Sequence, residues 1–120
     1  MISRKQGLRV CALGAVLLSA VGTAAFAQDN NTFYGTGALS SNTTGTDDSA
    51  FGFDALFSNT TGSDNTASGY QSLFTNTTGN WNTASGVNAL IYNTTGSYNT
   101  ASGAGALEFN STGSNKPPAD

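Results

Sequence analysis

Residues Asn65 to Trp81 read Asn-Thr-Ala-Ser-Gly-Tyr-Gln-Ser-Leu-Phe-Thr-Asn-Thr-Thr-Gly-Asn-Trp, and this pattern returns along the chain every 17 residues. Five such units tile residues 31–115 without an insertion, and two glycines recur in every unit. One leucine also recurs in every unit: Leu39, Leu56, Leu73, Leu90 and Leu107. A repeat this strict is typical of stacked architectures, in which each unit contacts mainly its neighbours.

The residue pattern inside one unit excludes a helix. Apolar residues do not recur at three- and four-residue spacing, and two glycines in each unit disfavour helical turns. We expect short strands at Thr66–Ser68 and Ser72–Thr75, with turns after each of them. Each unit is then one coil. The sequence predicts an all-β fold, a parallel β-roll or β-solenoid of five 17-residue coils with the leucines in its interior.

Asparagine at the start of each Asn-Thr-Thr turn occupies equivalent places in successive coils. Asn tolerates the left-handed backbone that tight turns require, and stacked Asn side chains can bond to one another. The predicted ladder consists of Asn42, Asn59, Asn76, Asn93 and Asn110.

The two ends of the chain differ from the repeats. Arg4, Lys5 and Arg9 precede an apolar run, and small residues precede Gln28, which is typical of a secretory signal peptide over residues 1–27 cleaved between Ala27 and Gln28. Residues 28–30 form a short lead, and residues 116–120 form a C-terminal tail. The apolar run is shorter than a membrane span, so we expect the mature chain to be exported to the periplasm, the cell surface or the extracellular space.

The predicted mature chain contains no cysteine or histidine, and Lys116 is its only basic residue. An acidic chain without clusters of Arg or Lys is a poor partner for nucleic acid. The lack of His and Cys also removes the usual catalytic groups, so we predict a protein that is not an enzyme and carries no cofactor. The absence of disulfides in a small exported chain indicates that stacking or association stabilises it.

A second apolar column lies next to the leucines, at Phe57, Phe74 and Ile91. Adjacent side chains of an extended strand point to opposite faces, so the two columns cannot line one interior. We therefore expect another copy of the chain to cover the second column, which makes these three residues a candidate oligomer face. In the first and last units this column ends in Ser40 and Glu108, and such polar residues limit further stacking.

The phrase Asn82-Thr83-Ala84-Ser85-Gly86-Val87-Asn88-Ala89-Leu90 resembles the head repeats of trimeric autotransporter adhesins. It also resembles the Asn-Thr-Thr-Gly repeats of bacterial adhesin-like and phage tail-fibre proteins. The resemblance covers residues 31–115. It implies a parallel β-roll, a homotrimer, and display on a bacterial cell surface to hold a host or matrix surface.

Other candidate sites have simpler interpretations. Asp47, Asp48, Asp54 and Asp64 do not recur in one column, so they are better interpreted as loop charges than as calcium ligands, and no metal site is predicted. The repeated Asn-Thr-Thr sequence matches a glycosylation signal, but turn chemistry explains it. Trp81, Tyr92 and Tyr98 form either a binding patch, for a sugar or another partner, or a packing surface.

Three functions fit these features. A secreted or surface-exposed structural or adhesive module is favoured by export, repeats and the resemblance. The alternative is a single-chain secreted β-solenoid, with either an ice-binding or a self-assembling matrix role. Hydroxyl pairs such as Thr66-x-Ser68 and Thr83-x-Ser85 favour ice binding, whereas the Asn, Gly, Ser and Thr content favours assembly.

Overall fold

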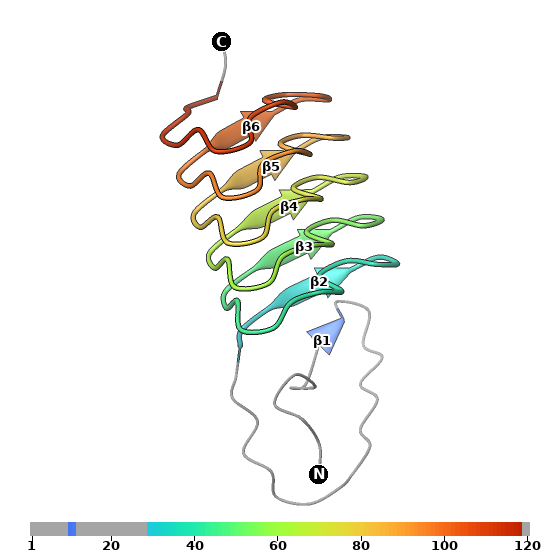
Figure 1. Ribbon diagram of the computed structural model, residues 1–120. Coiled ribbons are helices and arrows are strands. Elements are labelled where there is room, and N and C mark those ends of the chain that lie inside the picture. The colour runs from blue at the N-terminus through green and yellow to red at the C-terminus, as the bar shows by residue number, and fades with distance from the viewer. Residues whose placement is uncertain (1–9, 12–28, 119–120) are drawn as a thin grey trace, which may run out of the picture.

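Each 17-residue unit forms one coil of a β-solenoid, and the coils stack along a single axis (Figure 1). The computed structural model describes residues 10–11 and 29–118. The predicted cleavage site at Ala27 and Gln28 lies outside these residues, as do most of the predicted signal peptide and residues 119–120. We number the coils 1 to 5, beginning at Asn31, Asp48, Asn65, Asn82 and Asn99.

Every coil contributes one short strand to a parallel sheet. The strands are β2 (Thr32–Tyr34), β3 (Ser49–Phe51), β4 (Thr66–Ser68), β5 (Thr83–Ser85) and β6 (Thr100–Ser102). Each strand residue pairs with the equivalent residue 17 positions later, as Thr66 does with Thr83 and Ala67 with Ala84. The predicted all-β solenoid and its 17-residue spacing are thus confirmed. A further strand, β1 (Val10–Cys11), pairs parallel to β2 at the sheet edge.

The expected second strand at Ser72–Thr75 is wrong, because this part of each coil is a chain of tight turns. In coil 4, Ala89 N–H donates to Gly86 O at 3.3 Å, Ile91 N–H to Asn88 O at 3.3 Å and Asn93 N–H to Leu90 O at 3.0 Å. Asn88 and Leu90 have φ of 58° and 53°, a left-handed backbone of the kind found at the third residue of type II turns. Bonds between coils, rather than strand pairing, hold these turns in register: Leu73 N–H donates to Ala89 O at 3.0 Å.

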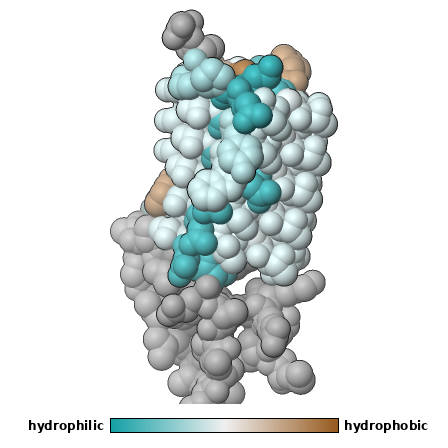
Figure 2. Space-filling view, turned by 90° about the vertical axis from the view of Figure 1, so that its left-hand side faces the viewer, coloured by the Kyte–Doolittle hydropathy of each residue, from teal (hydrophilic) through white to brown (hydrophobic). Residues whose placement is uncertain are grey.

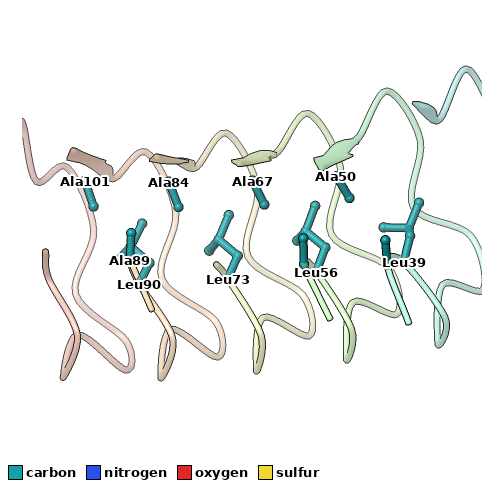
Figure 3. Packing of buried hydrophobic residues seen from close by; sticks show 11 residues of the cluster. Leu39, Ala50, Leu56, Ala67, Leu73, Ala84, Ala89, Leu90 and Ala101 are labelled. Atoms are coloured by element: carbon teal, nitrogen blue, oxygen red, sulfur yellow. The ribbon is translucent and has the colours of Figure 1, made fainter. Parts of the chain in front are cut away.

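The interior of the solenoid is narrow and apolar. Figure 3 shows the strand alanines, among them Ala67 and Ala84, pointing toward the leucines of the turns. Leu56, Leu73 and Leu90 are fully buried. Glycine is required where the chain turns out of the strand, because a Cβ on Gly69 would lie 2.5 Å from Gly86 O in the next coil.

Every leucine of the column has a positive φ, between 49° and 54°. A left-handed backbone costs a residue with a Cβ about 1 kcal/mol or more, so local preference does not explain this conformation. At Leu39, Leu56, Leu73 and Leu90, burial of the side chain offsets the cost, since fully burying a leucine stabilises by about 2 kcal/mol. The described residues contain no helix of a length and hydrophobicity suited to crossing a membrane.

Candidate functional site

Two columns of buried polar side chains run along the stack. The first is the predicted asparagine ladder, whose members donate from Nδ2 to Oδ1 of the asparagine one coil earlier. For Asn59, Asn76, Asn93 and Asn110 as donors these distances are 3.1, 2.8, 2.9 and 3.0 Å. Each of these four also donates to the glycine carbonyl three residues later, as Asn76 does to Gly79 O at 3.0 Å. The ladder therefore closes each turn and joins it to its neighbour.

The second column was not predicted from the sequence. It consists of the residue just before each strand: Asn31, Asp48, Asn65, Asn82 and Asn99. Asn82 Nδ2 donates to Asn65 Oδ1 at 3.1 Å and to Gly96 O at 2.8 Å, and Asn82 N–H also donates to Asn65 Oδ1 at 3.0 Å. The 17-residue recurrence of asparagine at this place was the available signal.

Asp48 is the exception in the second column, and its side chain is fully buried. Its Oδ1 accepts from Asn65 N–H at 2.9 Å and from Asn65 Nδ2 at 3.1 Å, and its Oδ2 accepts from Asn59 Nδ2 at 3.0 Å. Burial raises the pKa of Asp48 from 3.8 to about 7. The bonds from Asn65 lower this pKa and the carboxylates of Asp64 and Asp47 raise it, but desolvation is the largest cause. Asp48 therefore changes charge near neutral pH.

The candidate oligomer face has only part of its apolar surface exposed. Phe57 and Phe74 are half-buried and stack with ring centroids 5.2 Å apart and an interplanar angle of 13°. Ile91 is only 8% exposed in the single chain. Ser40 is exposed and Glu108 is half-buried at the two ends of the same column. The structure thus places the three residues in one row, with their own chain covering much of it.

Aromatic side chains stack between coils on several sides of the molecule. Phe53 stacks on Tyr70, Trp81 on Tyr98 and Tyr92 on Phe109, with centroids 5.5, 6.4 and 5.6 Å apart. All six rings are exposed: Phe53 48%, Tyr70 47%, Trp81 55%, Tyr92 47%, Tyr98 59% and Phe109 80%. Trp81, Tyr92 and Tyr98, which the sequence left open between binding and packing, thus pack within the chain and still face solvent.

The side from which the strands start carries the acidic loop residues Asp29, Asp47 and Asp64. The residue two places before each strand has a positive φ: Asn30, Asp47, Asp64, Trp81 and Tyr98. Figure 2 looks onto this side and shows a strongly hydrophilic band along the stack, bordered by residues of intermediate hydropathy. Among the described residues no three His, Cys, Asp or Glu side chains are grouped so as to hold a metal ion.

The outer face of the sheet presents hydroxyl groups. Thr66, Ser68, Thr83 and Ser85 are exposed on either side of the buried strand alanines. The parallel register places Thr66 beside Thr83 and Ser68 beside Ser85, and β6 continues both rows. At the N-terminal end of this face, Tyr34 and Phe51 replace the serine. The serine row therefore extends over three strands, whereas Ser49 and Thr32 continue the threonine row over β3 and β2.

No protein family, no curated protein and no solved structure matches this chain. The resemblance to adhesin heads therefore rests on the repeat sequence, chiefly the Asn-Thr-Ala-Ser-Gly phrase and the leucine column.

Proposed function

We propose that this protein is an exported, non-enzymatic structural or adhesive module that acts on the cell surface, in the periplasm or outside the cell. The observation that carries the proposal is the set of aromatic pairs that stack between coils and remain exposed. Exposed aromatic rings are favoured at contact surfaces because they bury a large apolar area with few rotatable bonds. The stacking of the coils holds the two rings of each pair with their centroids 5.5 to 6.4 Å apart.

A homotrimer is part of this proposal, with Phe57, Phe74 and Ile91 as the contact face. It is supported by the resemblance to adhesin heads and by the apolar surface that Phe57 and Phe74 leave exposed. Light scattering after size exclusion measures the mass of the chain that begins at Gln28. At the lowest concentrations measured we expect a trimer that Phe74→Asp dissociates, and a monomer mass there would remove this part of the proposal.

The adhesive role is tested by binding of the same chain to surfaces of defined chemistry, namely a methyl-terminated monolayer, cellulose and collagen. The variant Trp81→Ser/Tyr98→Ser removes one exposed pair, and Thr78→Ser/Thr95→Ser is the matched control on exposed threonines. We expect retention on at least one surface, and a severalfold loss in the aromatic variant only. Retention that is absent, or that is equal in both variants, contradicts the proposal.

Ice binding is the second candidate, and the hydroxyl rows on β4, β5 and β6 favour it. These rows are regularly spaced, because parallel strands in register repeat at about 4.8 Å, and Thr66, Thr83 and the three serines are exposed. Thermal hysteresis of the purified chain measures this activity directly. If the activity exists, Thr83→Lys in the middle of the rows abolishes it, whereas Thr95→Lys elsewhere on the surface leaves it unchanged.

A further inference from the structure

The C-terminal end of the stack presents backbone donors that have no acceptor among the described residues. In coil 4, Leu90 N–H donates to Ala106 O at 2.9 Å, Tyr92 N–H to Glu108 O at 3.2 Å and Thr94 N–H to Ser111 O at 2.8 Å. The equivalent N–H groups of coil 5 belong to Leu107, Phe109 and Ser111, and no described residue accepts from them. Coil 5 therefore carries the donor pattern by which each coil binds the next.

The N-terminal end presents the complementary acceptors. Ala55 O, Phe57 O and Thr60 O accept from coil 1 at 3.0, 3.1 and 2.9 Å. The equivalent carbonyls of coil 1 are those of Ala38, Ser40 and Thr43, and no described residue donates to them. Donors at one end and acceptors at the other match position by position, because both belong to the same repeat.

The apolar residues of the C-terminal coil are also less buried than their equivalents in the inner coils. Leu107 and Ala106 are only partly buried, whereas Leu56, Leu73 and Leu90 are fully buried by the coils on both sides. A Cβ on Gly103 would meet no atom within 4 Å, although a Cβ on Gly86 would lie 2.5 Å from Gly103 O. The space above Gly103 is thus the space that the next coil takes elsewhere in the stack.

We propose that this end, formed by Ala106, Leu107, Phe109 and Ser111, docks coil 1 of a second copy of the chain. The two copies then continue the 17-residue stack head to tail. Such a contact is heterologous and leaves a free end on each copy, so it produces rods rather than a closed ring. The inference is independent of the adhesive and ice-binding proposals, since it uses only the ends of the stack.

The edge of β2 accepts a parallel strand, as its pairing with β1 demonstrates. Because β1 belongs to the predicted signal peptide, its removal frees this edge for β6 of another copy. At the other end Lys116 takes the place above coil 5 that Asn31 of a second copy requires, since Thr100 N–H donates to Lys116 O at 2.7 Å. Docking must displace Lys116, and the contact between copies is therefore weaker than stacking within one chain. As an association of separate chains, it also depends on concentration.

The docked arrangement places Ser40 of one copy over Glu108 of the other, because both belong to the same column. These polar residues, expected from the sequence to limit stacking, weaken the contact between copies without preventing it. Adjacent members of this column in one chain, Phe57 and Phe74, have their rings 5.2 Å apart. A charge at position 40 therefore interacts with Glu108 only when two copies dock. Within one chain the two residues lie four coils apart at opposite ends of the stack.

The experiment measures the mass of the chain that begins at Gln28 over a wide concentration range by light scattering, with electron microscopy for rods. We expect association that rises with concentration without reaching a fixed mass, and none in the chain that retains β1. Ser40→Lys lowers the concentration for half-association by roughly threefold, and Ser40→Glu raises it by a similar factor. Ser40→Glu/Glu108→Lys restores association.

Thr78→Lys and Thr78→Glu are the matched controls, because they change the net charge equally at an exposed position of coil 3, in the middle of the stack. Melting curves of all variants confirm that the fold is retained. The proposal is overturned by a mass that does not change with concentration, including a constant trimer. It is equally overturned if the Ser40 variants behave as the Thr78 variants do.

Discussion

Two columns of buried polar side chains run through the same stack, yet only the column from Asn42 to Asn110 is uniform. An amide carries both a donor and an acceptor, so a stack of asparagines satisfies itself from coil to coil. A carboxylate has only acceptors, and in the other column Asp48 brings charge into a fully buried row. The difference indicates that the ladder geometry tolerates an acid only where several amide donors surround it, as Asn59 and Asn65 surround Asp48.

Asn76→Asp puts a carboxylate in the uniform column and should destabilise the chain most. Asn76 Nδ2 donates to Asn59 Oδ1 at 2.8 Å and to Gly79 O at 3.0 Å, and an aspartate loses both bonds and faces two oxygens. We expect a loss of about 3–5 kcal/mol in the free energy of unfolding at pH 8, measured with denaturant. A much smaller loss would mean that the two columns are equally tolerant.

The pH dependence of the natural chain is the next largest effect. Below pH 4 the Asp48 carboxyl becomes protonated in both the folded and the unfolded chain. Its burial then costs no stability, and its contribution to the free energy of unfolding is at its most favourable. Between pH 4 and 7 the folded chain keeps a proton that the unfolded chain has released, so the free energy of unfolding falls as pH rises. The total loss is up to about 4 kcal/mol, and it is constant above pH 8.

Asp48→Asn is the control for this profile, because it makes the second column uniform and lets residue 48 donate to Gly62 O as Asn65 does to Gly79 O. The variant should be more stable than the natural chain at pH 8 and about equal to it at pH 4. Denaturant unfolding at both values checks this. A profile that the substitution leaves unchanged would assign the titration to another group.

The smallest effect compares the middle and the end of the uniform column. Asn110→Ala removes two bonds from a half-buried residue, and water replaces part of what is lost. We expect a cost of about 1 kcal/mol, against about 2–3 kcal/mol for Asn76→Ala in the buried interior. Thermal melts of the two variants rank them. Equal costs would indicate that coil 5 is as well ordered around Asn110 as coil 3 is around Asn76.

The sequence predicted those parts of the fold that follow from residues recurring at the same place in every 17-residue unit. The glycine and leucine columns determined the coil length, and Thr66–Ser68 is a strand as expected. The strand expected at Ser72–Thr75 failed because Leu73 has φ of 51°, a conformation that no local preference of leucine favours. The turn itself holds it, closed by bonds such as Asn76 N–H to Leu73 O, because Leu107 keeps the same turn without a following coil.

Of the two buried polar columns, one could be predicted from the sequence and the other could not. The Asn76 column was predictable because every coil has asparagine there, in a turn whose chemistry suits it. The Asn65 column was missed because Asp48 interrupts the identity and because its members directly precede a strand, where asparagine has no obvious local role. The burial that raises the pKa of Asp48 depends on packing against Asn59 and Asn65, which one sequence does not reveal.

The left-handed leucines also have a consequence for how the chain folds. A lone coil would carry the backbone strain of its leucine before any neighbour buried the side chain, so an isolated coil is an unfavourable species. Growth adds a coil to an existing one and gains burial and inter-coil bonds at the same step. Folding therefore begins with a slow nucleus of at least two adjacent coils and then propagates quickly along the rod. Partly formed coils should not accumulate on the way.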